Sequence, residues 1–323
     1  MPRFDLLAVD RAGVAEFAAD VRYYLSLTPP QLPSRYFYDD LGSALFEAIC
    51  LLPWYTITRA ETRLLAACGD ELLQRLPSLR RIVELGPGSG EKLHTLLESA
   101  TSRRGSIDVH LVDVSASALA LASQRLETLR DIHLVAHRAT YDAGLRQATA
   151  AAGGPTLVAF LGSNIGNFDA PGAAAFLQNV RTSLAEGDGL LLGVDLVKPA
   201  DRLLLAYNDP LGVTAAFNRN LLVRINRELG AEVDLAGFSH QAVWNATQSR
   251  VEMHLVATAA QTLRIPRAQV DARLGAGDYI WTESSYKYLP ETINALLQSC
   301  GFGPIGQWVD RDDGFALTLA AAL

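Results

Sequence analysis

From about residue 80 onward, short apolar runs rich in β-branched residues alternate with longer stretches whose apolar positions recur at helical spacing. The apolar runs predict strands at Ile82–Leu85, Val109–Val114, Ile132–Val135, Leu157–Leu161 and Leu190–Val194. The helical spacing predicts helices between them, for example at Ala116–Leu129 and Ala170–Leu184. Strands that alternate with helices pair in parallel, so we expect an α/β fold with a doubly wound, Rossmann-like sheet.

The part of the chain before residue 80 is predicted to be helical. Helical spacing indicates a helix at Val14–Leu25, another that includes Leu45 and Cys50, and a third from about Leu64 to Leu73. Thr58 and Glu61 match the S/T-x-x-E capping box, which predicts that the third helix starts there. An aromatic-rich loop, LPWYTIT, precedes that start.

The alternation breaks after Asp195. Residues 198–234 are predicted to be helical with a polar loop, and Ala242–Trp244 and Val251–Ala257 alternate as antiparallel strands do. Strand and turn at Tyr279–Tyr288, a helix at Pro290–Cys300 and a last strand near Phe315–Leu319 follow. We therefore expect the doubly wound domain to comprise residues 60–196 and 287–323, and a second, α+β domain to comprise residues 1–59 and 197–286.

Composition and charge narrow the classes of protein. The chain has 323 residues, of which 49% are hydrophobic and 20% charged, as in ordinary globular proteins. A net charge of -7 without a dense basic run argues against nucleic-acid binding, and no apolar run reaches the roughly 18 residues of a membrane helix. The N-terminus lacks a signal peptide's apolar core, and the three scattered cysteines suggest reduced thiols. We expect a cytoplasmic protein, and a monomer, since no coiled coil demands a dimer.

The stretch RIVELGPGSGEK, from Arg81 to Lys92, carries the first functional motif. Gly86, Gly88 and Gly90 follow a buried strand that contains the acid Glu84. Glycines there allow positive φ and a close approach of the backbone to a ligand, and the next helix points free N–H groups at it. The G-x-G-x-G spacing fits a sulfonium nucleoside better than the pyrophosphate of a dinucleotide, whose motif is G-x-G-x-x-G.

Two further polar positions stand at the ends of predicted strands. Asp113, at the tip of the second strand, suits the two hydroxyls of a ribose, although a surface aspartate beside a turn of glycines has the same pattern. The run GSNIGNF follows the fourth strand, and its Asn167 has the donor and acceptor that an amino-acid head group needs. Taken alone, Asn167 fits a loop cap better than a substrate contact.

Six blocks of sequence, in this order, identify a family: FYDDLGSALFEAI, LPWYTITRAET, VELGPGSGEK, FLGSNIGNF, DLVKPADRLLLAYNDPLGVTAAFNRNLL and WTESSYKY. Together they resemble the histidine-specific Nα-methyltransferases of ergothioneine biosynthesis, from about Leu32 to near the C-terminus. The resemblance implies a class I methyltransferase domain that binds S-adenosylmethionine and a second domain that binds substrate. It implies trimethylation of the α-amino group of L-histidine to hercynine, one methyl at a time. It further implies that S-adenosylhomocysteine would be the by-product, that no metal would take part, and that the partners would be L-histidine and its mono- and dimethylated forms.

The resemblance also implies roles for individual residues. Cofactor contacts are implied for Tyr38, Gly86, Gly88, Lys92, Asp113, Thr140 and Tyr141, although Thr140 stands where the family pattern has an acid. Substrate contacts are implied for Phe46, Tyr55, Gly162, Asn167, Tyr207, Met253, Glu283 and Ser285. Asn167 and Tyr207 would hold the α-amino and carboxylate groups, and Tyr38 or Tyr207 would relay the amine's proton to solvent. Glu283 and Ser285 would receive the imidazole, with Glu283 deciding for histidine.

Three other functions remain open at this point. A paralogue could methylate tryptophan or tyrosine, but an indole or phenol has no use for both Glu283 and Ser285. A non-catalytic cofactor-binding or regulatory subunit is also possible, and the intact glycine loop, Asp113 and Asn167 argue against it. A nicotinamide dehydrogenase is disfavoured by the spacing of the glycines.

Overall fold

The computed structural model describes residues 11–101, 105–150 and 154–323, and contacts along the chain divide it into two compact units. Unit 1 comprises Met1–Phe46, Tyr207–Val243 and Glu252–Glu283. Unit 2 comprises Glu47–Ala206, Trp244–Val251 and Ser284–Leu323. Residues 47–59 and 197–206 thus group with unit 2, whereas the sequence assigns them to the second domain. The functional division into a cofactor domain and a substrate domain stays a prediction.

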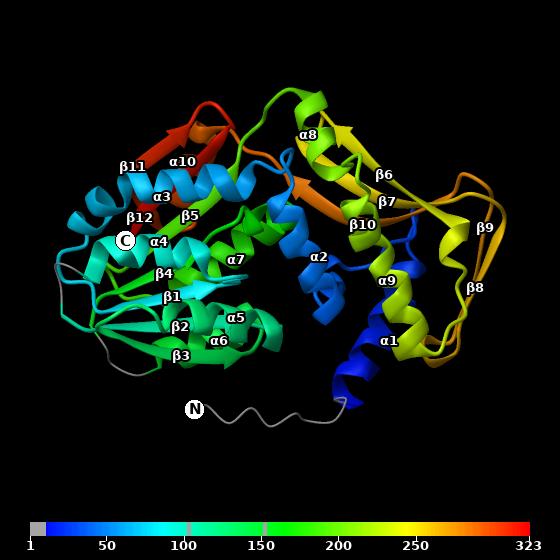
Figure 1. Cartoon of the computed structure of the whole chain (residues 1–323), viewed down its shortest axis with the longest axis horizontal. Helices are drawn as coiled ribbons and strands as arrows, with labels where there is room; N and C mark the ends of the chain where they lie inside the picture. Colours follow the sequence, from blue (N-terminus) through cyan, green and yellow to red (C-terminus); the bar gives the residue numbers. More distant parts are fainter. Residues whose placement is uncertain (1–10, 102–104, 151–153) are drawn as a thin grey trace. The chain divides into compact units, whose positions relative to one another are not determined.

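Unit 2 is built on a seven-stranded sheet in the order β11-β12-β5-β4-β1-β2-β3 (Figure 1). The strands are β1 (Arg81–Leu85), β2 (Ile107–Asp113), β3 (Ile132–Arg138), β4 (Thr156–Phe160), β5 (Gly189–Asp195), β11 (Phe302–Asp310) and β12 (Phe315–Ala322). Strands β1 to β5 pair in parallel, whereas β12 is antiparallel to both β5 and β11. The predicted α/β sheet is confirmed, and β1 and β4 lie side by side where the strand order reverses.

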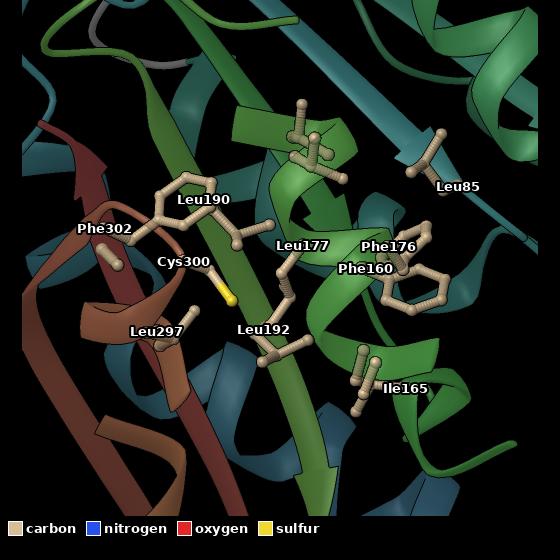
Figure 2. Close-up of a cluster of buried hydrophobic side chains, with 14 of the residues drawn as sticks. Leu85, Phe160, Ile165, Phe176, Leu177, Leu190, Leu192, Leu297, Cys300 and Phe302 are labelled. Carbon is tan, nitrogen blue, oxygen red and sulfur yellow. The ribbon is translucent and has the colours of Figure 1, made fainter. Parts of the chain in front are cut away.

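Helices cover both faces of this sheet (Figure 1). They are α3 (Ile57–Gln74), α4 (Glu91–Thr101), α5 (Ala116–Leu126), α6 (Tyr141–Thr149), α7 (Ala170–Thr182) and α10 (Pro290–Ser299). Helices α6, α7 and α10 pack on one face, where Phe160, Phe176 and Leu192 belong to a continuous buried cluster (Figure 2). Burial of these apolar side chains supplies the main driving force for the layered arrangement.

Unit 1 combines helices with two small sheets. Its elements include α1 (Arg11–Leu25), η1 (Ser34–Phe37), α9 (Val213–Leu229), η3 (Leu235–Gly237), η4 (Pro266–Ala268) and a hairpin of β8 (Gln261–Ile265) and β9 (Val270–Leu274). The strands β6 (Phe238–Asn245), β7 (Arg250–Ala257) and β10 (Tyr279–Tyr286) form a sheet in the order β10-β7-β6. The sequence predicted antiparallel strands near β6 and β7, but it missed the β8–β9 hairpin.

The start of α2 (Asp40–Leu51) shows how the sequence fixes unit 1 locally. Asp39 caps the helix, because its Oδ1 accepts a hydrogen bond from the backbone N–H of Gly42 at 2.8 Å. The same oxygen accepts from Asn220 Nδ2 of α9 at 2.7 Å. A Cβ on Gly42 would lie 1.6 Å from the carbonyl oxygen of Phe37, so only glycine allows this turn to pack against η1.

The predicted start of α3 is wrong in its detail. The helix begins at Ile57 with Thr56 as its N-cap, so Thr58 already lies inside the helix. Glu61 does not close a capping box; its side chain is fully buried within unit 2. A local motif is overridden here by partners that lie far away in the sequence.

Elsewhere the predicted elements are found with modest shifts. The helical region after Asp195 forms α8 (Ala200–Tyr207) and α9, and the last strand extends to Ala322. Strand β11 was not predicted. Cys50, Cys68 and Cys300 are free thiols. No helix within residues 11–101, 105–150 and 154–323 combines the length and apolar character needed to cross a membrane.

Candidate active site

The loop after β1 turns on glycines in the left-handed region. Gly86, Gly88 and Gly90 have φ values of +74°, +53° and +74°. The backbone N–H of Gly86 donates to the carbonyl oxygen of Val112 in β2 at 2.8 Å. A Cβ on Gly90 would lie 2.9 Å from Cα of Ala122 in α5, so the loop passes directly against that helix. The glycine spacing therefore produces a tight turn that leads into the N-terminus of α4.

Asp113 is the last residue of β2, and Tyr141 follows β3 as the first residue of α6. Asp113 Oδ1 accepts from the backbone N–H of Ser115 at 2.8 Å, yet burial raises the pKa of this carboxyl. Tyr141 opens α6 and packs edge-on against Phe160 at a ring separation of 5.3 Å. Burial, with a smaller effect from Asp113, raises the pKa of the Tyr141 phenol. A Cβ on Gly86 would lie 3.0 Å from the Tyr141 hydroxyl, so the ring borders the glycine loop.

Thr140 immediately precedes this tyrosine. It is the N-cap of α6, and its side chain makes no capping hydrogen bond. Its backbone carbonyl accepts from the N–H of Gly144 at 2.8 Å, which starts the helix.

Glu61, Lys92 and Gly162 form a buried charged cluster beside the glycine loop. Glu61 Oε2 lies 2.8 Å from Lys92 Nζ and accepts from the backbone N–H of Gly162 at 2.8 Å. Burial alone would lower the pKa of Lys92, but attraction to Glu61 outweighs it and leaves this pKa raised. A Cβ on Gly162 would lie 2.9 Å from Lys92 Nζ. Lys92 and Gly162, which the sequence assigned to cofactor and substrate, are therefore neighbours.

Glu84 lies under this cluster in the fully buried β1. Burial raises its pKa to about 8, and nearby Lys92 only partly opposes the shift. Its Oε2 has no hydrogen-bond partner among the described residues. Such a group is protonated at neutral pH and carries no charge there.

The GSNIGNF run forms a strained loop after β4. Ser163 is buried and adopts φ +60°, a left-handed conformation that side chains other than glycine seldom take. Its Oγ accepts from the backbone N–H of Asp195 at 2.9 Å. A Cβ on Gly166 would lie 2.7 Å from the carbonyl oxygen of Tyr286 in β10. The loop thus contacts the ends of β5 and β10, and Asn167 is the last residue of its short helix η2 (Asn164–Asn167).

Asp195, at the end of β5, joins two lysines. Its Oδ2 lies 2.9 Å from Lys287 Nζ, and its Oδ1 lies 2.6 Å from Lys198 Nζ. Lys287 Nζ also donates to Ser285 Oγ at 2.9 Å. Burial lowers the pKa of Lys198 in spite of its aspartate partner. Within unit 2, Asp195 thus contacts the GSNIGNF loop through its backbone N–H, and its carboxylate is linked through Lys287 to Ser285, which is predicted to contact the imidazole.

Tyr55 is a buried residue of unit 2 in the loop that leads into α3. Its backbone N–H donates to the carbonyl oxygen of Leu52 at 3.2 Å. The neighbouring Trp54 and Ile57 line a cavity that also borders Asp195.

Unit 1 carries the other predicted site residues. Tyr38 and Phe46 pack edge to face with their ring centroids 5.6 Å apart, and both rings contact Phe217 of α9. Tyr207 is buried at the end of α8, and its carbonyl oxygen accepts from His240 Nε2 at 2.8 Å.

Met253 and Glu283 come from neighbouring strands of the β10-β7-β6 sheet. Met253 is buried on β7, and its carbonyl oxygen accepts from Thr282 Oγ1 at 2.9 Å. Glu283 is partly exposed on β10, two positions before Ser285, which is the spacing at which the side chains of a strand point to one side.

The structure therefore gathers the predicted residues into two groups. Gly86, Lys92, Asp113, Tyr141 and Gly162 gather at the carboxyl ends of the strands of unit 2, and Tyr38 and Phe46 gather in unit 1. Sequence reasoning missed Glu61, whose motif suggested a cap, and Lys287, a single lysine directly after the end of β10.

This fold and site define a class. A parallel sheet with a glycine loop after β1, an acid at the tip of β2, and an antiparallel β12 beside β5 is the architecture of class I S-adenosylmethionine-dependent methyltransferases. The model of a family described as "Histidine-specific methyltransferase, SAM-dependent" matches residues 17–322. The chain belongs to this family.

Relatives of known name agree with the assignment. A histidine N-alpha-methyltransferase of Mycobacterium tuberculosis is 41% identical over 96% of this chain and 96% of its own length. The enzyme of the same name from Mycolicibacterium smegmatis is 38% identical over 97% of both chains. Ergothioneine biosynthesis protein 1 of Neurospora crassa is 28% identical over 87% of this chain and 32% of its own length.

Among solved structures, similarity is more distant. Magnesium protoporphyrin IX methyltransferase from Synechocystis PCC 6803 matches with a TM-score of 0.45 and 12% identity, over 90% of this chain and 98% of that one.

Proposed function

We propose that this protein transfers methyl groups from S-adenosylmethionine to the α-amino group of L-histidine, one at a time, to form hercynine. The observation that carries the proposal is the match to the histidine-specific family over residues 17–322. S-adenosylhomocysteine would be the by-product, and the proposed reaction needs no metal. Histidine and its mono- and dimethylated forms would be the small-molecule partners.

The residues of unit 2 fit the cofactor. The positive φ values of the glycine loop leave a backbone cradle that side chains would fill, and Asp113 is a partly buried carboxyl suited to ribose hydroxyls. We assign Gly86, Gly88 and Lys92 to the methionine part of the cofactor, and Asp113, Thr140 and Tyr141 to its nucleoside. Tyr38 is assigned as a further contact. When bound, S-adenosylmethionine supplies a methyl group on a positively charged sulfur.

The chain's own residues would prepare the amine. Asn167 and Tyr207 would hold the α-amino and carboxylate groups, supported by Gly162, so that the nitrogen lone pair points at the methyl group. Such alignment can lower a barrier by several kcal/mol, on the order of 7 in favourable cases. Because the free amine is protonated at neutral pH, Tyr38 or Tyr207 would pass its proton to solvent before each transfer.

The remaining substrate residues would recognise the side chain. Glu283 would accept a hydrogen bond from the imidazole, Ser285 would contact its other nitrogen, and Tyr55, Phe46 and Met253 would line the ring's faces. Aromatic faces also tolerate the trimethylammonium product through cation–π attraction.

The strongest alternative is a related enzyme that methylates another amino acid. Two 4-dimethylallyltryptophan N-methyltransferases are 25% and 26% identical to this chain, well below the 38% to 41% of the histidine N-alpha-methyltransferases. Glu283 and Ser285 also favour an imidazole over an indole or a phenol. We further propose a monomer in the cytoplasm, as the composition suggests.

The experiment is a turnover assay with S-adenosylmethionine in which each of the twenty amino acids is offered in turn and products are weighed by mass spectrometry. We expect histidine to gain three methyl groups. Glu283→Ala should lose the preference for histidine, whereas Glu291→Ala, which removes an exposed carboxylate on α10, should keep it. Methylation of a different amino acid would move the proposal to the alternative, and no turnover would refute it.

A further inference from the structure

A chain of hydrogen bonds within unit 1 connects the end of α8 to strands β7 and β10. His240 Nε2 lies 2.8 Å from the carbonyl oxygen of Tyr207, and His240 Nδ1 lies 2.9 Å from Asn218 Nδ2. On the other side of the amide, Asn218 Oδ1 accepts from Thr282 Oγ1 at 2.7 Å. The same hydroxyl lies 2.9 Å from the carbonyl oxygen of Met253. Asn218 and His240 therefore link the backbone at Tyr207 to both strands.

The side-chain amide of Asn218 has a fixed orientation. Its Nδ2 lies 3.1 Å from the backbone carbonyl oxygen of His254 in β7, and a carbonyl oxygen can only accept. The atom that faces it is therefore the NH2 group, because a flipped amide would place two acceptors against each other. Asn218 is 0% exposed, and a buried donor or acceptor without a partner is costly. The second hydrogen of the NH2 group points to His240, and Oδ1 accepts from Thr282.

These partners fix the proton of His240 at Nε2. Its Nδ1 faces an NH2 donor and must be the acceptor, whereas its Nε2 faces the carbonyl oxygen of Tyr207 and must carry the hydrogen. Burial lowers the pKa of the imidazole, and Arg219 and His254 add to this effect, against the opposing influence of the Tyr207 carbonyl and Asp209. His240 is therefore a neutral imidazole in a single tautomer.

The bond to Tyr207 satisfies a carbonyl group at the end of a helix. The last four carbonyl groups of an α-helix have no partner within the helix, and α8 ends at Tyr207. Tyr207 is 8% exposed, so this polar group is largely removed from water. His240 gives it a donor whose direction is set by Asn218 of α9. The backbone at Tyr207 is thereby held against α9 and, through the amide, against the β10-β7-β6 sheet.

We propose that Asn218 and His240 are positioning residues, which hold Tyr207 in a fixed place relative to β7 and β10 and so keep the amino-acid head group of the substrate aligned with its ring pocket. This inference rests on the proposed function and deepens it. Tyr207 is assigned to the head group, whereas Met253 on β7 and Glu283 on β10 are assigned to the ring. A misplacement of about 1 Å at a distance from the reacting atoms can cost about 100-fold in rate.

Replacement of His240 by phenylalanine is the first test. His240→Phe keeps a planar ring but removes both ring nitrogens, which leaves the Tyr207 carbonyl and the Asn218 NH2 group without this partner. We expect kcat/KM for histidine to fall by about tenfold or more. The KM for histidine should rise by about threefold or more, and that for S-adenosylmethionine by less than about twofold, since the glycine loop lies in unit 2.

Further variants separate positioning from stability. His240→Gln keeps an N–H donor and an acceptor, so it should recover most of the loss. The double variant Asn218→Leu with His240→Phe should lose little beyond the larger single loss, because both changes break one chain of hydrogen bonds. Asn226→Leu is the matched control, since Asn226 also lies on α9 and bonds the backbone of Val233 twice, at 2.9 and 2.8 Å. It should lower the melting temperature without raising the KM for histidine.

Two kinetic outcomes would overturn the inference. One is a His240→Gln protein as impaired as His240→Phe, which would show that the hydrogen bonds of the ring do not matter. The other is a rise in the KM for histidine in Asn226→Leu equal to that in His240→Phe, which would show that any loss of stability in unit 1 has this effect.

A measurement on the unmodified protein applies even where these variants do not fold. Long-range proton–nitrogen NMR distinguishes the two tautomers of histidine, and the signal of His240 among the six histidines is identified by its loss in His240→Gln or by isotope-edited contacts with Tyr207. At about pH 7 we expect a proton at Nε2 and none at Nδ1. The other tautomer, or an imidazolium, would refute the inference. If the unmodified protein does not methylate histidine, the proposed function fails whatever the tautomer, and the positioning role fails with it.

Discussion

Replacement of Glu61 by methionine tests the buried charged cluster beside the glycine loop. The substitution keeps the approximate volume but removes the carboxylate that faces Lys92 Nζ at 2.8 Å and the N–H of Gly162 at 2.8 Å. The Glu61 side chain is fully buried, and that of Lys92 is 19% exposed. Loss of one partner of a buried ion pair costs about 3–5 kcal/mol, because the remaining charge is left uncompensated. Partial access of water to Lys92 reduces our expectation to about 2–4 kcal/mol.

The double variant Glu61→Met with Lys92→Met gives the sharper result. Removal of both charges takes away the uncompensated ammonium, so we expect the double variant to be about 2 kcal/mol more stable than Glu61→Met alone. The affinity for S-adenosylhomocysteine should not recover with it, since Lys92 is a proposed cofactor contact. Glu71→Met, which breaks a half-exposed ion pair on the same helix, should change stability by less than about 1 kcal/mol.

The assay is urea unfolding followed by circular dichroism, with calorimetric binding of S-adenosylhomocysteine to each folded variant. A Glu61→Met protein within about 0.5 kcal/mol of the original, the range of ordinary surface substitutions, would refute the reasoning. A double variant as unstable as the single one would do the same, because it would show that the carboxylate acts through something other than Lys92.

Two further predictions concern β1 and its loop. Burial raises the pKa of Glu84 from 4.5 to about 8, so the native state binds a proton that the unfolded state releases, and stability from this group falls as pH rises from about 4.5 to 8. Glu84→Gln should flatten that fall, because the amide does not titrate: we expect a gain in the free energy of unfolding on the order of 4 kcal/mol at pH 8 and little gain at pH 4.5. Chemical unfolding measured across this pH range tests this, and an unchanged dependence of the unfolding free energy on pH would contradict it. Gly90→Ala should lower the melting temperature and the affinity for S-adenosylhomocysteine, because a left-handed φ costs about 1–2 kcal/mol and its Cβ would meet Ala122. Gly187→Ala is the control, because Gly187 also has a left-handed φ, +85°, but a Cβ added there would have nothing within 4 Å and incurs only the backbone cost. Equal losses of stability in the two variants would argue against the contact between Gly90 and Ala122.

The parallel strands were predictable because their signal is local. Strands β1, β4 and β5 are fully buried, so each is largely apolar, with Glu84 as an exception in β1, and each ends at turn residues. Strand β11 gave no such signal, because Gly303, Pro304 and Gly306 interrupt it and its residues are mostly half-buried. The β8–β9 hairpin was missed for a related reason: both strands alternate with charged, exposed positions.

The candidate site divides in the same way. The glycine loop and Asp113 follow from motif spacing, and the structure places them at the strand ends where they were expected. The partners of Glu61, which lie 31 and 101 residues away in the sequence, and the ion pair of Lys287 with Asp195, 92 residues away, could not be predicted because these pairings depend on the closed sheet. The roles assigned to the substrate residues stay predictions.

The antiparallel strand β12 has a consequence for the order in which the chain can fold during synthesis. It separates β5 from β11, so β5 lacks its neighbour on that side until residues 315–322 have been made. Some 120 residues are translated between the end of β5 and the start of β12, which at about 5–20 residues per second takes on the order of ten seconds. For that time the apolar strand LLLGV presents an open edge, which is the feature that most invites aggregation or chaperone capture.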